Sequence, residues 1–181
     1  MIQTKRLLLR QWQPSDFPLF AELCADSEVM KYFPSTLSRA ESDDFVARIQ
    51  GLIAERGWGL WAVEVPGVSD FIGFVGLHVP KDYLPFSPCV EIGWRLAKSY
   101  WGKGYASEAA KAALNYAFTE LQLDEVLSFT SVTNLPSQAV MKRIGMTNTH
   151  RNFMHPDIEA GHPLCEHVLY RLDRSEWARG D

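Results

Sequence analysis

Two glycines, Gly102 and Gly104, stand where a predicted strand gives way to a predicted helix. Residues 90–96 alternate apolar and other side chains, as half-buried strands do, and residues 105–121 carry apolar side chains at helical spacing. The first turn of a helix has unpaired backbone N–H groups and the positive end of the helix dipole. Because glycine has no Cβ, a ligand can approach such backbone closely. The stretch is suited to bind a phosphate or pyrophosphate, although a Gly-x-Gly pair is also typical of a plain tight turn.

This loop does not fit either of two common nucleotide-binding motifs. A P-loop needs Ser or Thr after its Gly-Lys pair, and here Gly104 follows Lys103. A dinucleotide fingerprint needs a third glycine, and Ser107 stands at that position. A dinucleotide-binding oxidoreductase is therefore a weak hypothesis, and a ligand panel scored by thermal shift would test for NAD binding.

Composition places the chain in a broad class. Its 181 residues suit a single domain, residues 1–181, and 46% hydrophobic residues suffice for an ordinary core. The net charge of -4 argues against a nucleic-acid partner and is compatible with a cationic acceptor such as an amine. No apolar run is long enough for a membrane span and the start lacks a signal-peptide core, so we expect no membrane association. Three widely spaced cysteines favour reduced thiols and a cytoplasmic location.

The elements around the glycine loop predict an α/β chain with a mixed, mostly antiparallel sheet, because several strands follow one another without helices between them. A Ser38–Glu41 capping box opens a helix that Gly57 ends, and Ser15 or Asp16 is expected to cap an earlier helix. The other expected strands are 4–12, 58–65, 71–79, 125–132, 146–154 and 166–172, and the other expected helices are 26–33 and 138–144.

Three separated blocks resemble the GNAT acetyltransferase superfamily. Residues 99–104 resemble its pyrophosphate loop, Gln/Arg-x-x-Gly-x-Gly/Ala, with Ser99 departing at the first position. Residues 134–146 resemble its Asn-x-x-(Ala/Ser) block. The start, residues 4–16, resembles the branch that contains the ribosomal-protein alanine and serine N-acetyltransferases. The resemblance runs from residue 4 to about residue 172.

The resemblance implies a GNAT fold, in which a central parallel strand pair splays apart, here 90–96 and 125–132. It implies acetyl-CoA as cosubstrate, and we expect no metal, on the residue spacing given below. The pantetheine arm would bond to the backbone of the first strand and the pyrophosphate to the glycine loop. The implied CoA-binding residues are Trp94, Arg95, Leu96, Trp101, Gly102, Lys103, Gly104, Tyr105, Ala106, Asn134 and Ser137.

The implied reaction is direct attack of a neutral amine on the thioester carbonyl, with a backbone N–H near Leu96 for the oxyanion. Glu91 is the candidate base, although strand alternation equally allows a glutamate on a solvated face. Ser137 is the candidate hydroxyl beside the CoA sulfur, with helix capping as its alternative role. Many GNAT enzymes place a tyrosine acid where this sequence has Met141.

The acceptor predicted from the branch resemblance is a primary amine, most of all the α-amino group of a protein or peptide, with a ribosomal protein as one candidate. The alternatives are a small-molecule amine, or a non-catalytic acyl-CoA-binding module. Four histidines and Cys165 crowd residues 150–167, but their spacing matches no structural zinc pattern. We expect a monomer or a homodimer.

Overall fold

The computed structural model describes residues 1–179 and divides into two compact units. Unit 1 comprises Met1–Leu77 and Gly93–Ala113, and unit 2 comprises His78–Ile92 and the chain from Leu114 onward. The chain passes from one unit to the other within strand β4 (Ser69–His78), strand β5 (Glu91–Leu96) and helix α3 (Tyr105–Thr119). That residues 1–181 act as a single domain stays a prediction.

The strands pair in the order β1-β2-β3-β4-β5-β6-β9-β7, and β8 also pairs with β9. Strand β5 runs parallel to β6, with Glu91 opposite Leu127. The antiparallel pairs are β1–β2, β2–β3, β3–β4, β6–β9, β7–β9 and β8–β9. The predicted mixed, mostly antiparallel sheet with one central parallel pair is therefore confirmed. The remaining strands are β1 Ile2–Gln3, β2 Leu8–Arg10, β3 Leu60–Val65, β6 Glu125–Ser131, β7 Thr147–Asn148, β8 Phe153–Met154 and β9 Glu166–Asp173.

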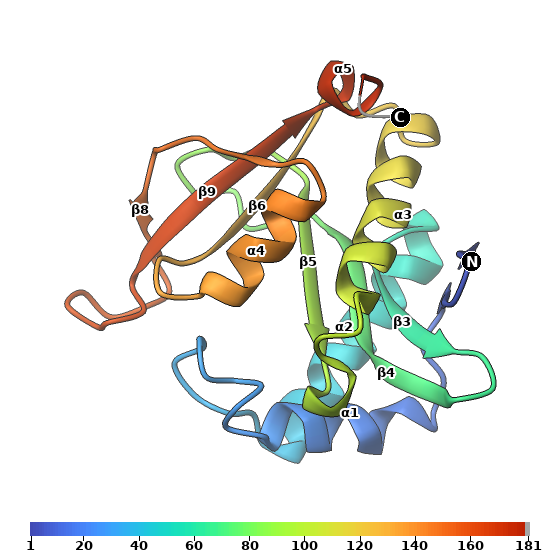
Figure 1. The fold of residues 1–181 in the computed structure, drawn as a ribbon. Helices are drawn as coiled ribbons and strands as arrows, with labels where there is room; N and C mark the ends of the chain where they lie inside the picture. Colours follow the sequence, from blue (N-terminus) through green and yellow to red (C-terminus); the bar gives the residue numbers. More distant parts are fainter. Residues whose placement is uncertain (180–181) are drawn as a thin grey trace. The chain divides into compact units, whose positions relative to one another are not determined.

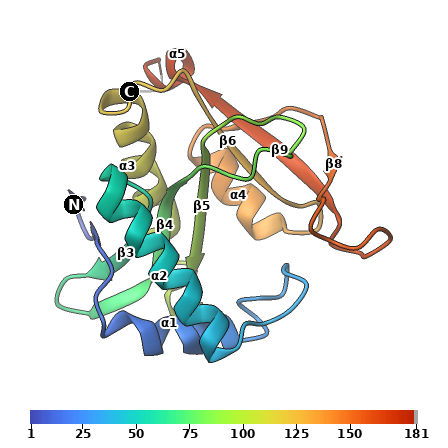
Figure 2. The same cartoon turned by 180° about the vertical axis from the view of Figure 1, so that it is seen from behind.

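In unit 1, helices α1 (Asp16–Ala25) and α2 (Arg39–Arg56) lie side by side in both views of the ribbon (Figures 1 and 2). Aromatic rings fill the space around them. The Phe20 ring lies edge-on to Trp12 at 5.1 Å and stacks on Phe45 at 5.4 Å. Strands β3 and β4 form the predicted hairpin, with buried side chains along nearly their whole length.

In unit 2, β6 and β9 pair over seven residues, and α4 (Leu135–Arg143) lies beside β6 (Figure 1). Helix α5 (Arg174–Trp177), which the sequence did not predict, follows β9 and places Trp177 against Phe118 at 5.9 Å. The buried residues of this unit include Val126, Leu127, Met141, Ile144, Val168, Leu169, Tyr170 and Leu172.

Several elements form for the local reasons that the sequence indicates. The Ser38 hydroxyl accepts from the Glu41 amide and the Glu41 carboxylate accepts from the Ser38 amide, which confirms the capping box. Gly57 ends α2 with φ 83°, a left-handed conformation that glycine adopts without strain. Helix α3 covers the predicted helical stretch, and its apolar stripe from Ala109 to Phe118 is buried.

Other predicted elements are wrong, and competing local contacts explain them. Of the strand expected over residues 4–12, only β2 forms, because a turn precedes it. In this turn the Thr4 amide donates to the Leu7 carbonyl and the Leu7 amide donates to the Thr4 hydroxyl. The helix expected over residues 26–33 is a series of turns, and the Asp26 carboxylate accepts from the Glu28 amide instead of extending a helix. The strand expected over residues 146–154 is split into β7 and β8 around His150, which has φ 55°.

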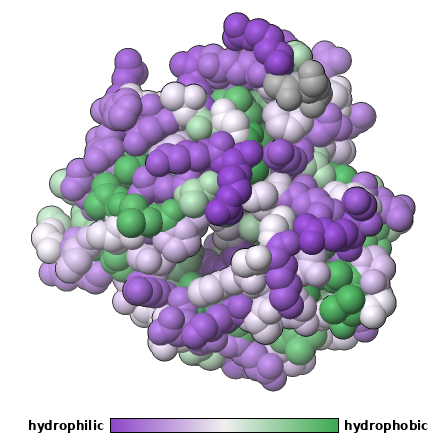
Figure 3. Space-filling view, in the orientation of Figure 1, coloured by the Kyte–Doolittle hydropathy of each residue, from purple (hydrophilic) through white to green (hydrophobic). Residues whose placement is uncertain are grey.

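On the face drawn in Figure 3, hydrophilic residues predominate and hydrophobic ones form separate areas. Large apolar side chains with substantial exposure include Phe33 and Trp101. Within residues 1–179, no helix combines the length and the apolarity that crossing a bilayer requires.

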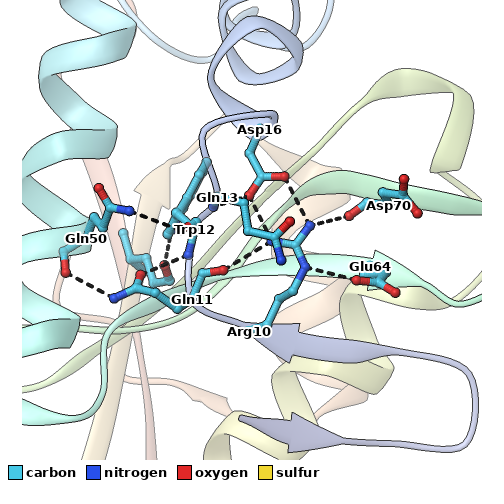
Figure 4. Close-up of polar contacts among 9 residues, drawn as sticks. Arg10, Gln11, Trp12, Gln13, Asp16, Gln50, Glu64 and Asp70 are labelled. Carbon is cyan, nitrogen blue, oxygen red and sulfur yellow. Dashed lines mark hydrogen bonds and ion pairs between the residues drawn. The ribbon is translucent and has the colours of Figure 1, made fainter.

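A buried ion pair joins β2 to the start of α1 (Figure 4). The Arg10 guanidinium donates to both oxygens of the Asp16 carboxylate, at 2.8 and 3.0 Å, and its Nε donates to Glu64 at 2.9 Å. Asp16 also accepts from the Gln13 amide, whereas Ser15 makes no side-chain cap. The hydrogen bond to Asp16 is the largest cause that raises the pKa of Arg10. Asp16, one of the two expected caps, thus pairs with Arg10 and joins α1 to β2. The prediction that Ser15 caps α1 is wrong.

We expect Asp16→Ala to lower the free energy of unfolding by about 3–5 kcal/mol, because it leaves a buried guanidinium without its main partner. Arg39→Ala, which removes an exposed ion pair with Asp43 on α2, is the control and should cost less than about 1 kcal/mol. Urea denaturation of both variants measures the difference. Equal losses would contradict the anchoring role of Asp16.

Candidate functional site

The glycine loop and the start of α3 leave a run of backbone N–H groups without protein acceptors. In residues 1–179, the amides of residues 102–107 donate to no backbone or side-chain acceptor, and the first bond into the loop is from the Glu108 amide to the Gly104 carbonyl at 3.0 Å. Gly102 and Gly104 both have positive φ, 72° and 79°. The exposed loop therefore presents several N–H donors together with the positive end of the α3 dipole.

The starts of three other helices differ from this one. Helix α1 also has no side-chain cap, but the Asp16 and Phe17 amides donate to the backbone carbonyls of Gln13 and Pro14. Helix α2 begins with the Ser38–Glu41 capping box, and the Asn134 side chain caps α4 by accepting from the Ser137 amide at 3.2 Å. A helix start without a side-chain cap is a ready anion site, because its free donors point at whatever lies beyond the terminus. The geometry of the loop thus fits a bound phosphate or pyrophosphate.

The N-terminal segment holds this loop in place, which the sequence did not indicate. The Arg6 guanidinium donates to the Glu108 carboxylate at 2.7 Å and to the Lys103 carbonyl at 3.0 Å, and it lies over the Tyr105 ring at 4.8 Å. The Thr4 hydroxyl also donates to Glu108, at 2.6 Å. These contacts join residues about a hundred positions apart, so no local pattern could have revealed them.

The end of β5 lies in the same unit as the loop. The Trp101 indole donates to the Leu96 carbonyl at 2.8 Å and so ties the loop to the strand end. Gly73 on β4 has φ 135°, and a Cβ there would come within 2.1 Å of the Arg95 carbonyl oxygen. The strands approach this closely because Gly73 has no side chain. Trp94 and Arg95 are partly exposed and Leu96 is buried.

Glu91, the candidate base, lies at the start of β5 in unit 2. Its backbone pairs with Leu127 of β6. Some surface of the residue stays accessible, but protein atoms surround the carboxyl group, and this burial raises its pKa to about 8. Within the described residues its carboxylate has no hydrogen bond or ion pair. The environment is that of a carboxyl group able to gain and lose a proton near neutral pH, not that of a glutamate on a solvated face.

Asn134 and Ser137 lie close together in unit 2. The Asn134 side chain is bonded at both ends, to the Ser137 amide and to the Thr130 hydroxyl at 2.9 Å. Because Asn134 is the cap of α4, capping does not explain Ser137, and the helix begins at Leu135 instead of the predicted residue 138. The Ser137 side chain is partly exposed and its hydroxyl has no partner in residues 1–179.

Met141 also lies on α4 and is 2% exposed. A thioether has no acidic proton, and this one is packed into the core of unit 2. Met141 therefore does not act as the acid that a tyrosine supplies in many enzymes of the resembled superfamily.

The histidine-rich region of unit 2 is an aromatic cluster. The His155 and His167 rings are 5.0 Å apart and lie against Phe129 and Phe153. Burial lowers the pKa of His167 to about 4. Over residues 1–179, no three His, Cys, Asp or Glu side chains are grouped to hold a metal ion.

The chain is similar to known acetyltransferases over most of its length. Residues 6–147 match the model of the acetyltransferase (GNAT) domain. It is 34% identical over 179 residues to the uncharacterized N-acetyltransferase YnaD of Bacillus subtilis, a match that covers 97% of this chain and 98% of that protein. The crystal structure of a GNAT-family acetyltransferase from Bacillus anthracis superposes with a TM-score of 0.80 at 30% identity and covers 96% and 98% of the two chains.

A more distant neighbour, RimL, the ribosomal L7/L12 alpha-N-protein acetyltransferase in complex with coenzyme A, has a TM-score of 0.72 at 19% identity, covering 94% and 95% of the two chains. This likeness concerns the fold. Together the matches define an acetyltransferase with the GNAT fold. The chain belongs to the GNAT acetyltransferase family, whose members use acetyl-CoA.

We expect Gly104→Ala to weaken CoA binding, because a side chain at φ 79° strains the loop and displaces its N–H donors. Gly67→Ala is the matched control, since Gly67 in the β3–β4 turn has φ 77°. A Cβ at Gly67 would meet nothing within 4 Å, and one at Gly104 would make only an ordinary contact, 3.4 Å from Arg6 Nη2. Both changes should cost about 1–2 kcal/mol of stability. Only Gly104→Ala should reduce the rise in melting temperature on addition of CoA. An unchanged CoA effect in Gly104→Ala would exclude the loop as the pyrophosphate site.

Proposed function

We propose that this protein transfers the acetyl group of acetyl-CoA to a primary amine, the α-amino group of a protein or peptide. The observation that supports the CoA part is the uncapped start of α3, where the amides of residues 102–107 have no acceptor among residues 1–179. A pyrophosphate is the group whose oxygens match several clustered donors. Arg6 orders this loop through Lys103 and Glu108.

In the proposed reaction, the nitrogen lone pair attacks the thioester carbonyl carbon and a C–N bond forms. The ammonium proton passes to the Glu91 carboxylate, directly or through one water molecule. The tetrahedral intermediate then expels the sulfur, and the C–S bond breaks. The Ser137 hydroxyl, which has no other partner within residues 1–179, donates a hydrogen bond to the departing thiolate and keeps its proton. Asn134 keeps Ser137 in place by capping the same helical turn.

The pKa of Glu91 bears on which amine is acetylated. A base with a pKa of about 8 is matched to an α-amino group, whose pKa in peptides is about 7.7–8.0. A lysine amine has a pKa of about 10.4, so far less of it is neutral and nucleophilic near pH 7. A modest base therefore suffices for an N-terminus. The ribosomal-protein acceptor and the cytoplasmic location stay predictions from the sequence.

We expect Glu91→Gln and Ser137→Ala each to reduce kcat/KM by about 10²–10⁴-fold, and to weaken CoA binding much less. The first change removes the base, and the second removes the hydrogen-bond donor to the departing thiolate. Wild-type kcat/KM should rise with pH through about pH 8, since the base must be deprotonated. Carboxyl-carbon NMR measures the Glu91 titration independently of the amine. Glu120→Gln, on an exposed residue after α3, is the control. Unchanged rates in both variants would remove these residues from the mechanism.

The acceptor class is tested by competition. Short peptides with free N-termini should be acetylated in preference to matched peptides with a blocked N-terminus and one lysine, and in preference to polyamines. Mass spectrometry locates the acetyl group. Acetylation of blocked peptides or polyamines alone would refute the N-terminal acceptor and keep the acetyltransferase. CoA binding without turnover of any amine would indicate a non-catalytic acyl-CoA-binding module.

A further inference from the structure

Arg95 of β5 lies among aromatic rings of unit 1. Its guanidinium carbon is 4.4 Å from the centroid of Phe33, and the rings of Phe74, Phe45 and Phe20 follow at 5.4, 5.7 and 5.9 Å. Such contacts attract a cation to the faces of the rings, but they supply no strong hydrogen-bond acceptor.

The hydrogen bonds of this guanidinium are almost entirely unmade. Nη1 donates to the Cys24 sulfur at 3.4 Å, a weak acceptor. Nε is buried without any partner, and in residues 1–179 no carboxylate contacts the group. Burial accordingly lowers the pKa of Arg95, with Cys24 as the interaction that opposes this. An arginine has five N–H donors, so most of its bonding capacity is free.

Arg10, in the same unit, is a buried arginine whose charge is compensated by carboxylates of the protein. Its guanidinium bonds Asp16 through two nitrogens and Glu64 through a third. A buried cation without such compensation is strongly unfavourable, and removing one partner of a buried pair typically costs several kcal/mol. The isolation of Arg95 therefore calls for an anion that is not part of this chain.

A second buried polar atom without a hydrogen bond lies in the same cluster. The Ser42 hydroxyl on α2 has no partner within hydrogen-bonding geometry, yet it is near enough to lower the pKa of Cys24, which contacts Arg95. Ser42 Oγ and Arg95 Nε are the two such side-chain atoms found in residues 1–179. Their concentration at one place indicates a polar site between apolar walls.

This site is near the surface. Phe33, the ring closest to the guanidinium, is 41% exposed, and Arg95 itself is partly exposed. Phe33 belongs to the turns that replace the expected helix over residues 26–33. Within residues 1–179, Nε has no partner and Nη2 makes no hydrogen bond, so the edge formed by these two nitrogens is open to a ligand.

We propose that Arg95 binds a carboxylate of the acceptor, so that the preferred substrate is an amine that also carries a carboxylate. A carboxylate is planar and accepts two parallel bonds from a guanidinium edge. Its single negative charge balances the single positive charge, whereas a phosphate dianion would leave an uncompensated charge among phenylalanine rings. The carboxylate comes either from an acidic side chain of a peptide or from a free amino acid. This inference rests on the proposed function, and it makes Arg95 a specificity-determining residue.

Binding of matched acceptors, measured by calorimetry in the presence of CoA, tests the proposal without requiring turnover. One pair consists of peptides that differ only by Glu or Gln after the free N-terminus, and the other consists of alanine and alaninamide. We expect the wild-type protein to bind the carboxylate member of at least one pair about 10- to 100-fold more tightly. The pair that shows the difference identifies the source of the carboxylate.

Arg95→Met should abolish this preference while leaving the affinities for the neutral members nearly unchanged. The contact with CoA that the family resemblance implies uses the backbone of Arg95, which this change retains. Arg95→Lys, which keeps the charge without the planar fork, should retain part of the preference and serves if Arg95→Met does not fold. Arg56→Met is the matched control, because Arg56 also stacks on an aromatic ring, Trp58, at 4.0 Å. It should keep the full preference.

Equal binding of acid and amide in both pairs by the wild-type protein would overturn the proposal. A preference that survives Arg95→Met would also overturn it. So would equally weakened binding of neutral and acidic acceptors by Arg95→Met, since that result indicates a purely structural arginine. A carboxylate preference without acetyl transfer to any tested amine would support the subsite and refute the proposed function.

Discussion

The free amides at the start of α3 are the constraint on which the site depends. A helix start normally satisfies its N–H groups with a side chain, as α2 does with Ser38 and Glu41. Before α3, two glycines with left-handed backbone conformation shape the loop, and the amides of residues 102–107 make no hydrogen bond within the described residues. An open loop of this kind needs support from elsewhere, and Arg6 supplies it by bonding the Lys103 carbonyl and the Glu108 carboxylate. The loop is therefore exposed but not unsupported.

The elements that the sequence predicted correctly have determinants within a few residues of one another. The α2 cap, the β3–β4 hairpin and the apolar stripe of α3 are of this kind. The wrong predictions arose where a polar side chain had two possible uses. Asp16 has the residue type and position of a cap, but its carboxylate pairs with Arg10, and Asp26 closes a local turn that a helix would have excluded. A propensity describes which local bonds are available, not which tertiary partner competes for them.

The same distinction explains how much of the candidate site could be foreseen. The glycine loop was predictable because strand, loop and helix are consecutive, and Asn134 and Ser137 are three residues apart. The raised pKa of Glu91 was not, since alternation along a strand does not say how many protein atoms surround a carboxyl group. Nor could the sequence reveal the surroundings of Arg95, whose contact with Cys24 joins residues 71 positions apart.

Three titratable side chains differ in whether a partner in the protein compensates for their burial. Arg10 is buried with two carboxylates, so its charge is compensated and the pair anchors β2 to α1. Glu91 and Arg95, both on β5, are surrounded by protein and have no opposite charge within the described residues. Burial without a partner disfavours each charged form and brings no gain to folding. Strand β5 thus carries a carboxyl group and a guanidinium group that lack partners in these surroundings. Our proposals supply both partners from the substrate: Glu91 takes a proton from the attacking amine, and Arg95 binds a carboxylate.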